Sequence, residues 1–132
     1  MILALIVSAA LGIEILLTDS DLWEATPEHA YGLMGFVTID FAIAGSIFVK
    51  KRLAYRLAIV WAIVQFSLML GDITTARTVG FDSYNQFVEY LFSLWNFDLL
   101  LITQPVIAFL GYKVLRSSKR GTIQPIVQPT KE

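Results

Sequence analysis

Four long apolar stretches dominate the pattern of hydrophobic and polar positions along the chain. They cover residues 1–17, 27–49, 53–76 and 87–112. Each is close to the roughly 20 residues that a helix needs to cross about 30 Å of hydrocarbon. Only helices and closed barrels span lipid, and the strict alternation of a barrel strand is absent here. The pattern therefore predicts an all-α fold, a polytopic membrane protein built as a four-transmembrane-helix bundle.

The first stretch is the weakest of the four. A helix over residues 1–17 would be about 25 Å long, which barely spans the hydrocarbon. The stretch could also be a secretory signal peptide, but it lacks a basic n-region and an A-x-A cleavage site. We expect it to be retained as a short transmembrane helix.

The domain organisation follows from the apolar stretches. We expect one transmembrane domain over residues 1–116 and a flexible cytoplasmic tail over residues 117–132. The tail carries the helix-breaking residues Gly121, Pro125 and Pro129.

Local signals predict two helix features. Thr26 is expected to cap the second helix, with Pro27 at its first position and Glu28 in its first turn. In the fourth helix, Pro105 removes one backbone hydrogen bond, so we expect an interruption or kink after Gln104.

The composition supports lipid as the solvent. Of the 132 residues, 56% are apolar and 16% charged, against about 45–50% and about 25% in soluble domains. The absence of cysteine excludes a thiol nucleophile, a disulfide and a thiolate metal site, and one histidine cannot form a multi-histidine site. No cofactor is predicted.

The basic residues predict the orientation. Eight of the ten follow the second or the fourth apolar stretch, a ninth, Arg56, lies in the first turn of the third on the same side, and the connections at the opposite ends are acidic. Because cytoplasmic loops carry the excess of Lys and Arg, we expect both termini to be cytoplasmic, in the cell (plasma) membrane. The basic residues are Lys50, Lys51, Arg52, Arg56, Lys113, Arg116, Lys119, Arg120 and Lys131, and the exception is Arg77.

Several polar residues fall inside the apolar stretches, where a charged group costs at least about 2.5 kcal/mol. Asp40 is expected near the bilayer midplane and Asp98 about 12 Å below the outer end of the fourth helix. Such a cluster could carry protons or cations or orient a ligand. Its members could instead form interhelical hydrogen bonds or face a partner subunit. The candidate residues are Asp40, Asp98, Gln65, Asp72, Asn96 and Arg77.

His29 and Glu28 form a second candidate site, at the outer membrane boundary. Imidazole and carboxylate together could contribute to a metal or ligand contact at a subunit interface. The alternative is that His29 is an ordinary hydrogen-bonded interfacial residue. One histidine cannot complete a metal site, so no metal is predicted for the chain alone.

Small residues recur at helical spacing on the first two predicted helices. Such small-xxx-small stripes let helix backbones approach closely, either with each other or with a neighbouring protein. The residues are Ala4, Ser8 and Gly12 on the first helix, and Gly35, Ala42 and Gly45 on the second.

These features favour a structural role. We expect a small non-catalytic integral membrane subunit that stabilises a larger membrane enzyme complex of respiratory or copper-monooxygenase type. Its partners are then the lipid bilayer and other membrane subunits, or further copies of itself. The alternative is a small oligomeric transporter, or a proton- or cation-conducting protein that uses its membrane carboxylates. Nucleic acid is excluded as a partner, because the basic residues flank membrane segments and suit anionic lipid.

Overall fold

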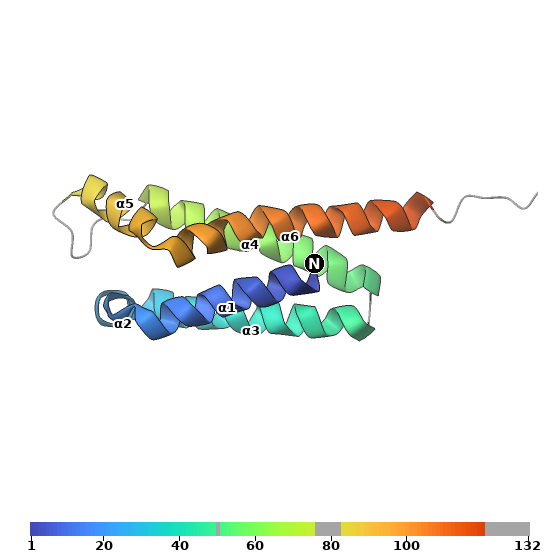
Figure 1. The fold of residues 1–132 in the computed structure, drawn as a ribbon, viewed down its shortest axis with the longest axis horizontal. Coiled ribbons are helices and arrows are strands. Elements are labelled where there is room, and N and C mark those ends of the chain that lie inside the picture. Colours follow the sequence, from blue (N-terminus) through green and yellow to red (C-terminus); the bar gives the residue numbers. More distant parts are fainter. Residues whose placement is uncertain (50, 76–82, 121–132) are drawn as a thin grey trace, which may run out of the picture.

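The computed structural model describes residues 1–49, 51–75 and 83–120, and no strand occurs among them. The all-helical prediction is confirmed for this part of the chain. The described residues form four long helices and two short ones, arranged as in Figure 1. The helices are α1 (Ile2–Thr18), α2 (Ser20–Ala25), α3 (Pro27–Val49), α4 (Lys51–Thr75), α5 (Tyr84–Ser93) and α6 (Trp95–Arg120).

The four long helices form a bundle in which α1 contacts α3 and α6, and α4 contacts the same two helices. Each long helix runs antiparallel to the two that it contacts (Figure 1). The short helices α2 and α5 lie together at one end of the bundle. This is the end where α1 and α4 finish and where α3 and α6 begin.

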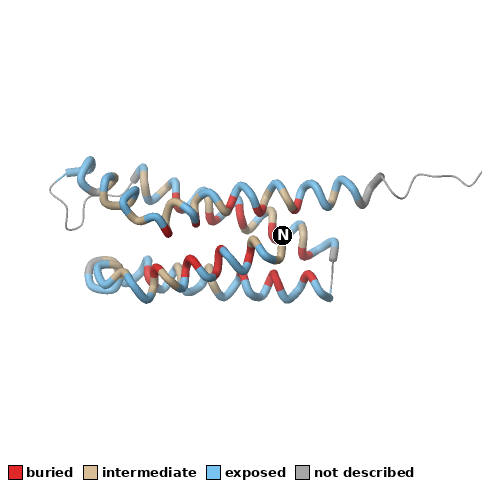
Figure 2. Tube along the Cα trace, viewed as in Figure 1, coloured by how far each residue is buried: buried red, intermediate tan, exposed pale blue. Residues whose placement is uncertain are grey.

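Three of these helices are long and apolar enough to cross a membrane, over Pro27–Val49, Arg52–Thr74 and Trp95–Ser117. Helix α1 is apolar but has only 17 residues, which gives a length of about 25 Å. Large apolar side chains cover the outer faces of the bundle, where Figure 2 shows exposed residues in pale blue; Leu3 is 73% exposed and Phe48 74%. Apolar surface of this extent requires lipid or protein around it.

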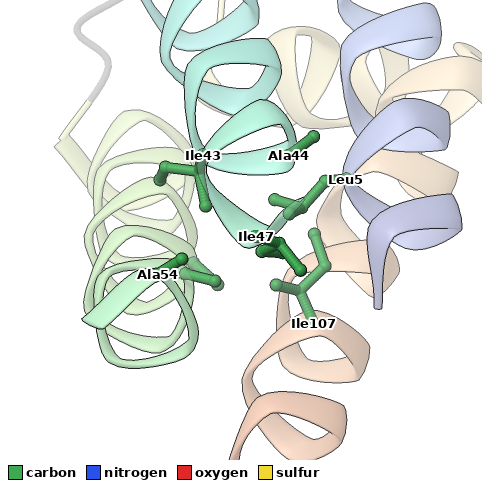
Figure 3. Close-up of a cluster of buried hydrophobic side chains, with 8 residues drawn as sticks. Leu5, Ile43, Ala44, Ile47, Ala54 and Ile107 are labelled. Atoms are coloured by element: carbon green, nitrogen blue, oxygen red, sulfur yellow. The ribbon is translucent and has the colours of Figure 1, made fainter. Parts of the chain in front are cut away.

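Two apolar clusters fill the inside of the bundle. The larger one includes Leu5, Ile47 and Ile107, which Figure 3 shows converging from α1, α3 and α6. Ala54, Ala58 and Ala62 of α4 complete it, and their small side chains allow that helix to approach closely. The smaller cluster lies nearer to α2 and α5 and consists of Leu11, Ile15, Met69 and Leu100.

Two glycines allow close contact between helices. A Cβ added to Gly12 would lie 2.7 Å from Cγ2 of Val37 on α3. A Cβ added to Gly111 would lie 2.7 Å from Cγ1 of Ile59 on α4. The contacts of α1 with α3 and of α4 with α6 therefore depend on a missing side chain at these positions.

The predicted helix over residues 87–112 differs from the structure. It is divided at Leu94, whose extended backbone separates α5 from α6. The hydroxyl of Ser93 donates to the Tyr90 carbonyl, and Oδ1 of Asn96 accepts from the Phe97 amide. Side chains that bond to nearby backbone in this way compete with continuous helix.

The expected interruption after Gln104 is wrong, because α6 continues through Pro105 to Arg120. Proline removes only one hydrogen bond, and packing of α6 against α1 and α4 holds the helix on both sides. The helix also extends past residue 117, where the tail was predicted to begin; residues 121–132 lie outside the described part.

The predicted start of the second helix at Pro27 is confirmed. The hydroxyl of Thr26, however, donates to the Leu22 carbonyl instead of accepting from the first turn of α3. Its backbone carbonyl accepts from the amides of His29 and Ala30. Thr26 closes the short helix α2, which the sequence pattern did not predict.

Candidate functional site

The most buried carboxylate of the described chain is Asp40 on α3, which is 1% exposed. Two side chains of α4 donate hydrogen bonds to its Oδ1 atom. They are Nε1 of Trp61 at 3.0 Å and Nε2 of Gln65 at 2.8 Å. Trp61 and Gln65 are four residues apart, so they lie one helical turn apart on the same face of α4.

Two further polar residues extend this contact to α1 and α6. Ser8 of α1 is buried and lies beside the Asp40 carboxyl. Nε2 of Gln104 on α6 donates to Oγ of Ser8 at 3.0 Å. We call Ser8, Asp40, Trp61, Gln65 and Gln104 the polar layer. It takes at least one side chain from each of the four long helices.

The polar layer lies between the two apolar clusters. On α1, Ser8 stands between Leu5 of the larger cluster and Leu11 of the smaller one. On α6, Gln104 stands in the same way between Ile107 and Leu100. Hydrogen bonds in such an apolar, water-poor setting are strong electrostatically, and an unpaired group there is costly. The layer therefore fixes which faces of the four helices meet.

The donors around Asp40 suit a carboxylate, which only accepts hydrogen bonds. The indole of Trp61 can only donate, and the Gln65 amide donates through its nitrogen. No charged side chain of the described residues contributes to the surroundings of Asp40. Uncharged side-chain donors, rather than a counter-ion, therefore satisfy the Asp40 carboxylate.

One atom of the polar layer has no partner. Oε1 of Gln104 is buried and accepts no hydrogen bond from any described residue. Nε2 of the same amide donates to Ser8 and, at 3.3 Å, to the Leu100 carbonyl. A buried acceptor without a donor typically costs about 1–3 kcal/mol.

The second pair of candidate residues that the structure brings together is His29 and Asp72. Nε2 of His29 lies 3.6 Å from Oδ1 of Asp72, and Nδ1 of His29 lies 4.0 Å from Oε1 of Glu28. About half of each of the His29 and Asp72 side chains is exposed. The contact joins the first turn of α3 to the end of α4, apart from the polar layer.

Asp98 and Asn96 stay apart from Asp40. Because α6 begins at Trp95, Asp98 lies in the first turn of this helix, so its predicted depth of 12 Å is wrong. Oδ1 of Asp98 is buried without a partner among the described residues. Asn96 is 6% exposed and bonds to its own backbone neighbour.

Arg77, the predicted outer basic residue, lies outside the described residues. Within residues 1–49, 51–75 and 83–120, no group of three His, Cys, Asp or Glu side chains is placed to hold a metal ion.

At the end of the bundle, Asp19 joins α2 to α5. Its carboxylate accepts from the Leu22 amide at 3.1 Å, as the N-cap of α2, and from the Tyr90 hydroxyl at 3.2 Å. Burial, and next the negative charge of Asp19, raise the pKa of Tyr90 to about 12. Asp19, Asp21 and Tyr90 line a small open pocket of about 180 Å³.

The two small-residue stripes do not face each other. On α1, Ser8 and Gly12 are buried, and Ala4 packs against the larger apolar cluster. On α3, Gly35, Ala42 and Gly45 are exposed, and a Cβ added to either glycine would meet no atom within 4 Å. Ala42 and Gly45, with Ser46 and Val49, line a shallow groove of about 380 Å³ on the outer face of the bundle.

Three members of the polar layer were not predicted as site residues for their polar groups. Ser8 was assigned to packing, Gln104 to the expected interruption, and Trp61 to no role. Ser8 and Gln104 do carry a signal, since each is a polar residue in the middle of an apolar stretch. Such residues in membrane helices usually bond across helices.

The fold and the site define an all-helical protein with three helices suited to a membrane and a buried polar layer around Asp40. Comparison with family models, with curated proteins and with solved structures found no match.

Proposed function

We propose that this protein is a non-catalytic integral membrane subunit that packs against and stabilises a larger membrane enzyme complex. The observation that carries the proposal is that the contacts of the buried Asp40 carboxylate are all made within this chain. The carboxylate is enclosed by donors of the same chain, so its contacts serve the internal arrangement of the four long helices.

Asp40 is buried and lines neither of the two cavities described above, which agrees with a role without chemistry. The pocket of about 180 Å³ lies beside Asp19 and Tyr90, and the groove of about 380 Å³ lies beside Ala42 and Gly45. Neither is lined by Asp40 or its partners. A substrate would need direct access to a reacting group.

The outer face of α3 supports contact with another membrane protein. Gly35 and Gly45 leave open space above the helix, and Ala42 lies between them. Helices in lipid associate mainly by close packing, and small residues permit the shortest approach. We therefore assign the groove beside Ala42 and Gly45 to a transmembrane helix of a partner subunit.

The proposal includes a topology of four spans with both termini in the cytoplasm of the cell. Arg52, Arg56, Lys113 and Arg116 lie at the end of the bundle opposite α2 and α5. The acidic residues Asp19, Asp21 and Glu24 lie at the α2 end. This separation agrees with the positive-inside bias.

A second candidate function is proton- or cation-linked transport by an oligomer of this chain. The observation in its favour is a buried carboxylate without a counter-ion, since ionisable groups inside membranes often belong to ion pathways. Uptake driven by a pH gradient in vesicles that hold only this protein, lost in Asp40→Asn, would support transport over the subunit role.

Purification from native membranes in a mild detergent tests the subunit role. We expect the tagged chain to elute with larger membrane proteins at a fixed stoichiometry. Elution as a single species that contains only this chain would reject it.

A further inference from the structure

The open pocket of about 180 Å³ at the end of the bundle that holds α2 and α5 has no part in the subunit role. Its lining includes Asp19 and Asp21 at the start of α2, Tyr90 of α5 and Asn96 of α6. We propose that this pocket binds a primary ammonium group on a molecule that also carries a hydrogen-bond-accepting oxygen, as an ethanolamine headgroup does.

Two negative charges act on this pocket without a positive partner. No basic side chain of residues 1–49, 51–75 and 83–120 forms an ion pair with Asp19 or Asp21. Burial is the largest cause of the raised pKa of Tyr90, and the charges of Asp19 and Asp21 both add to it. A cleft lined by charges of one sign concentrates ions of the opposite sign, so the pocket attracts a cation.

Asn96 supplies an independent observation that points to a ligand. It lines the pocket and is 6% exposed. Its side-chain amide faces the Phe97 backbone amide at 2.9 Å, and because a backbone N–H only donates, the atom that accepts is Oδ1. Nδ2 is then left without an acceptor among the described residues. A buried donor left unpaired is unfavourable, so an acceptor oxygen of a ligand in the pocket would satisfy it.

A primary ammonium fits this combination of groups better than a metal ion does. Hard metal cations take six or more oxygen ligands, and within the described part of the chain no three His, Cys, Asp or Glu side chains are placed to hold a metal. The Nδ2 donor of Asn96 also cannot bind a cation. An ammonium group has three N–H donors, and each carboxylate has about four acceptor positions. Asp19 therefore keeps acceptor positions although it already accepts from Leu22 and Tyr90.

Two sources share this chemistry, an ethanolamine phospholipid and a soluble amine such as glycerophosphoethanolamine. Large apolar side chains flank the pocket in the sequence. Leu17 precedes the lining residue Thr18 and is 80% exposed, and Trp95 precedes Asn96 and is 57% exposed. The acyl chains of a bound lipid would have this apolar surface to cover. The inference stands independently of the subunit role.

Native mass spectrometry of the full chain in detergent micelles, titrated with short-chain phosphatidylethanolamine and phosphatidylcholine, tests the proposal. The two lipids have the same net charge, but the choline nitrogen has no N–H to donate. We expect one phosphatidylethanolamine to bind at least about tenfold more tightly than phosphatidylcholine, because hydrogen bonds to charged groups are lost with choline. Glycerophosphoethanolamine that competes at the same concentration as the lipid would assign the site to a soluble amine, and weaker competition would assign it to the lipid.

Matched variants locate the binding in the pocket. Asp21→Asn should weaken phosphatidylethanolamine binding by about fivefold. The control Glu24→Gln removes the same charge from an α2 residue outside the pocket and should leave binding unchanged. Asn96→Leu should also weaken binding by about fivefold, through the loss of the Nδ2 donor.

Because Asp21 is exposed, its variant keeps the test decisive where Asn96→Leu fails to fold. Equal affinity of the wild type for the two lipids would overturn the proposal. So would an equal effect of Asp21→Asn and Glu24→Gln, or a folded Asn96→Leu chain that binds phosphatidylethanolamine as the wild type does.

Discussion

Gln65 and Asp40, 25 residues apart in the sequence, are joined by a 2.8 Å hydrogen bond from Nε2 of Gln65 to Oδ1 of Asp40. Both side chains are 1% exposed. The bond ties α4 to α3 at the level where Ser8 and Gln104 tie α1 to α6. In a bilayer, where apolar side chains gain little from leaving lipid, such bonds specify which helix faces meet.

The first prediction concerns this bond. Gln65→Leu keeps the approximate volume of the side chain but removes one donor from a buried carboxylate. We expect the free energy of unfolding in detergent micelles to fall by about 1–3 kcal/mol. The control Asn85→Leu changes an exposed residue of α5 and should stay within about 0.5 kcal/mol of the wild type. Equal stability of Gln65→Leu and the wild type would show that the bond contributes nothing.

The second prediction concerns the contact of α1 with α3. Gly12→Ala places a methyl group 2.7 Å from Cγ2 of Val37, and a β-branched side chain in a helix has little freedom to turn away. We expect a loss of about 1–3 kcal/mol in the free energy of unfolding, as for other overpacked sites. Gly35→Ala, where the methyl meets no atom within 4 Å, should be at least as stable as the wild type. Equal effects of the two variants would contradict the close contact.

The third prediction concerns the titration of Tyr90. Ultraviolet absorbance of tyrosinate should show one of the five tyrosines titrating near pH 12, the raised pKa of Tyr90, against an ordinary value of 10.0. Asp19→Asn should lower this pKa only in part, since burial is the larger cause and remains. Tyr90→Phe should remove the late step. A single step near 10 for all five tyrosines would contradict the placement of Tyr90 beside Asp19.

The same pKa has a consequence for stability. Folding binds the Tyr90 proton more tightly, so the folded chain holds more protons than the unfolded chain between about pH 10 and 12. The contribution of Tyr90 is therefore complete below about pH 10 and is lost as the pH rises through about 12. Tyr90→Phe should flatten the decline of stability over this interval.

The fourth prediction concerns the topology. The chain has no cysteine, so each introduced cysteine is a unique label. In intact cells, Ser20→Cys in α2 and Asn85→Cys in α5 should react with a membrane-impermeant maleimide, whereas Ser117→Cys near the end of α6 should react only after lysis. Protease added to intact cells should spare an N-terminal tag. Removal of that tag, with Ser20→Cys still labelled from outside, would show that α1 does not span.

The sequence predicted the helices that lipid, as the surrounding solvent, requires. The apolar stretches gave α1, α3 and α4 close to their observed bounds, because a residue inside lipid must be helical and apolar. It could not predict the break at Leu94, which depends on local bonds of Ser93 and Asn96 to the backbone. The break moves Asp98 to the first turn of α6.

The partners within the site were predictable only in part. Asp40 and Gln65 were both candidates, but their pairing depends on how α3 and α4 are rotated about their axes. The spacing of residues within one helix does not determine that rotation. The same holds for the small residues. Gly12 faces α3, whereas Gly35 faces away from the bundle, although both stripes have the same spacing in the sequence.

The subunit role is tested most directly by purifying three tagged chains from native membranes: the wild type, Ala42→Leu and Ala10→Leu. Ala42 and Ala10 are both exposed, but only Ala42 lines the groove on α3. We predict that the wild type and Ala10→Leu elute with the same larger membrane proteins at a fixed stoichiometry, and that Ala42→Leu elutes folded but without them. A wild-type chain that elutes alone, or only with copies of itself, would contradict the account.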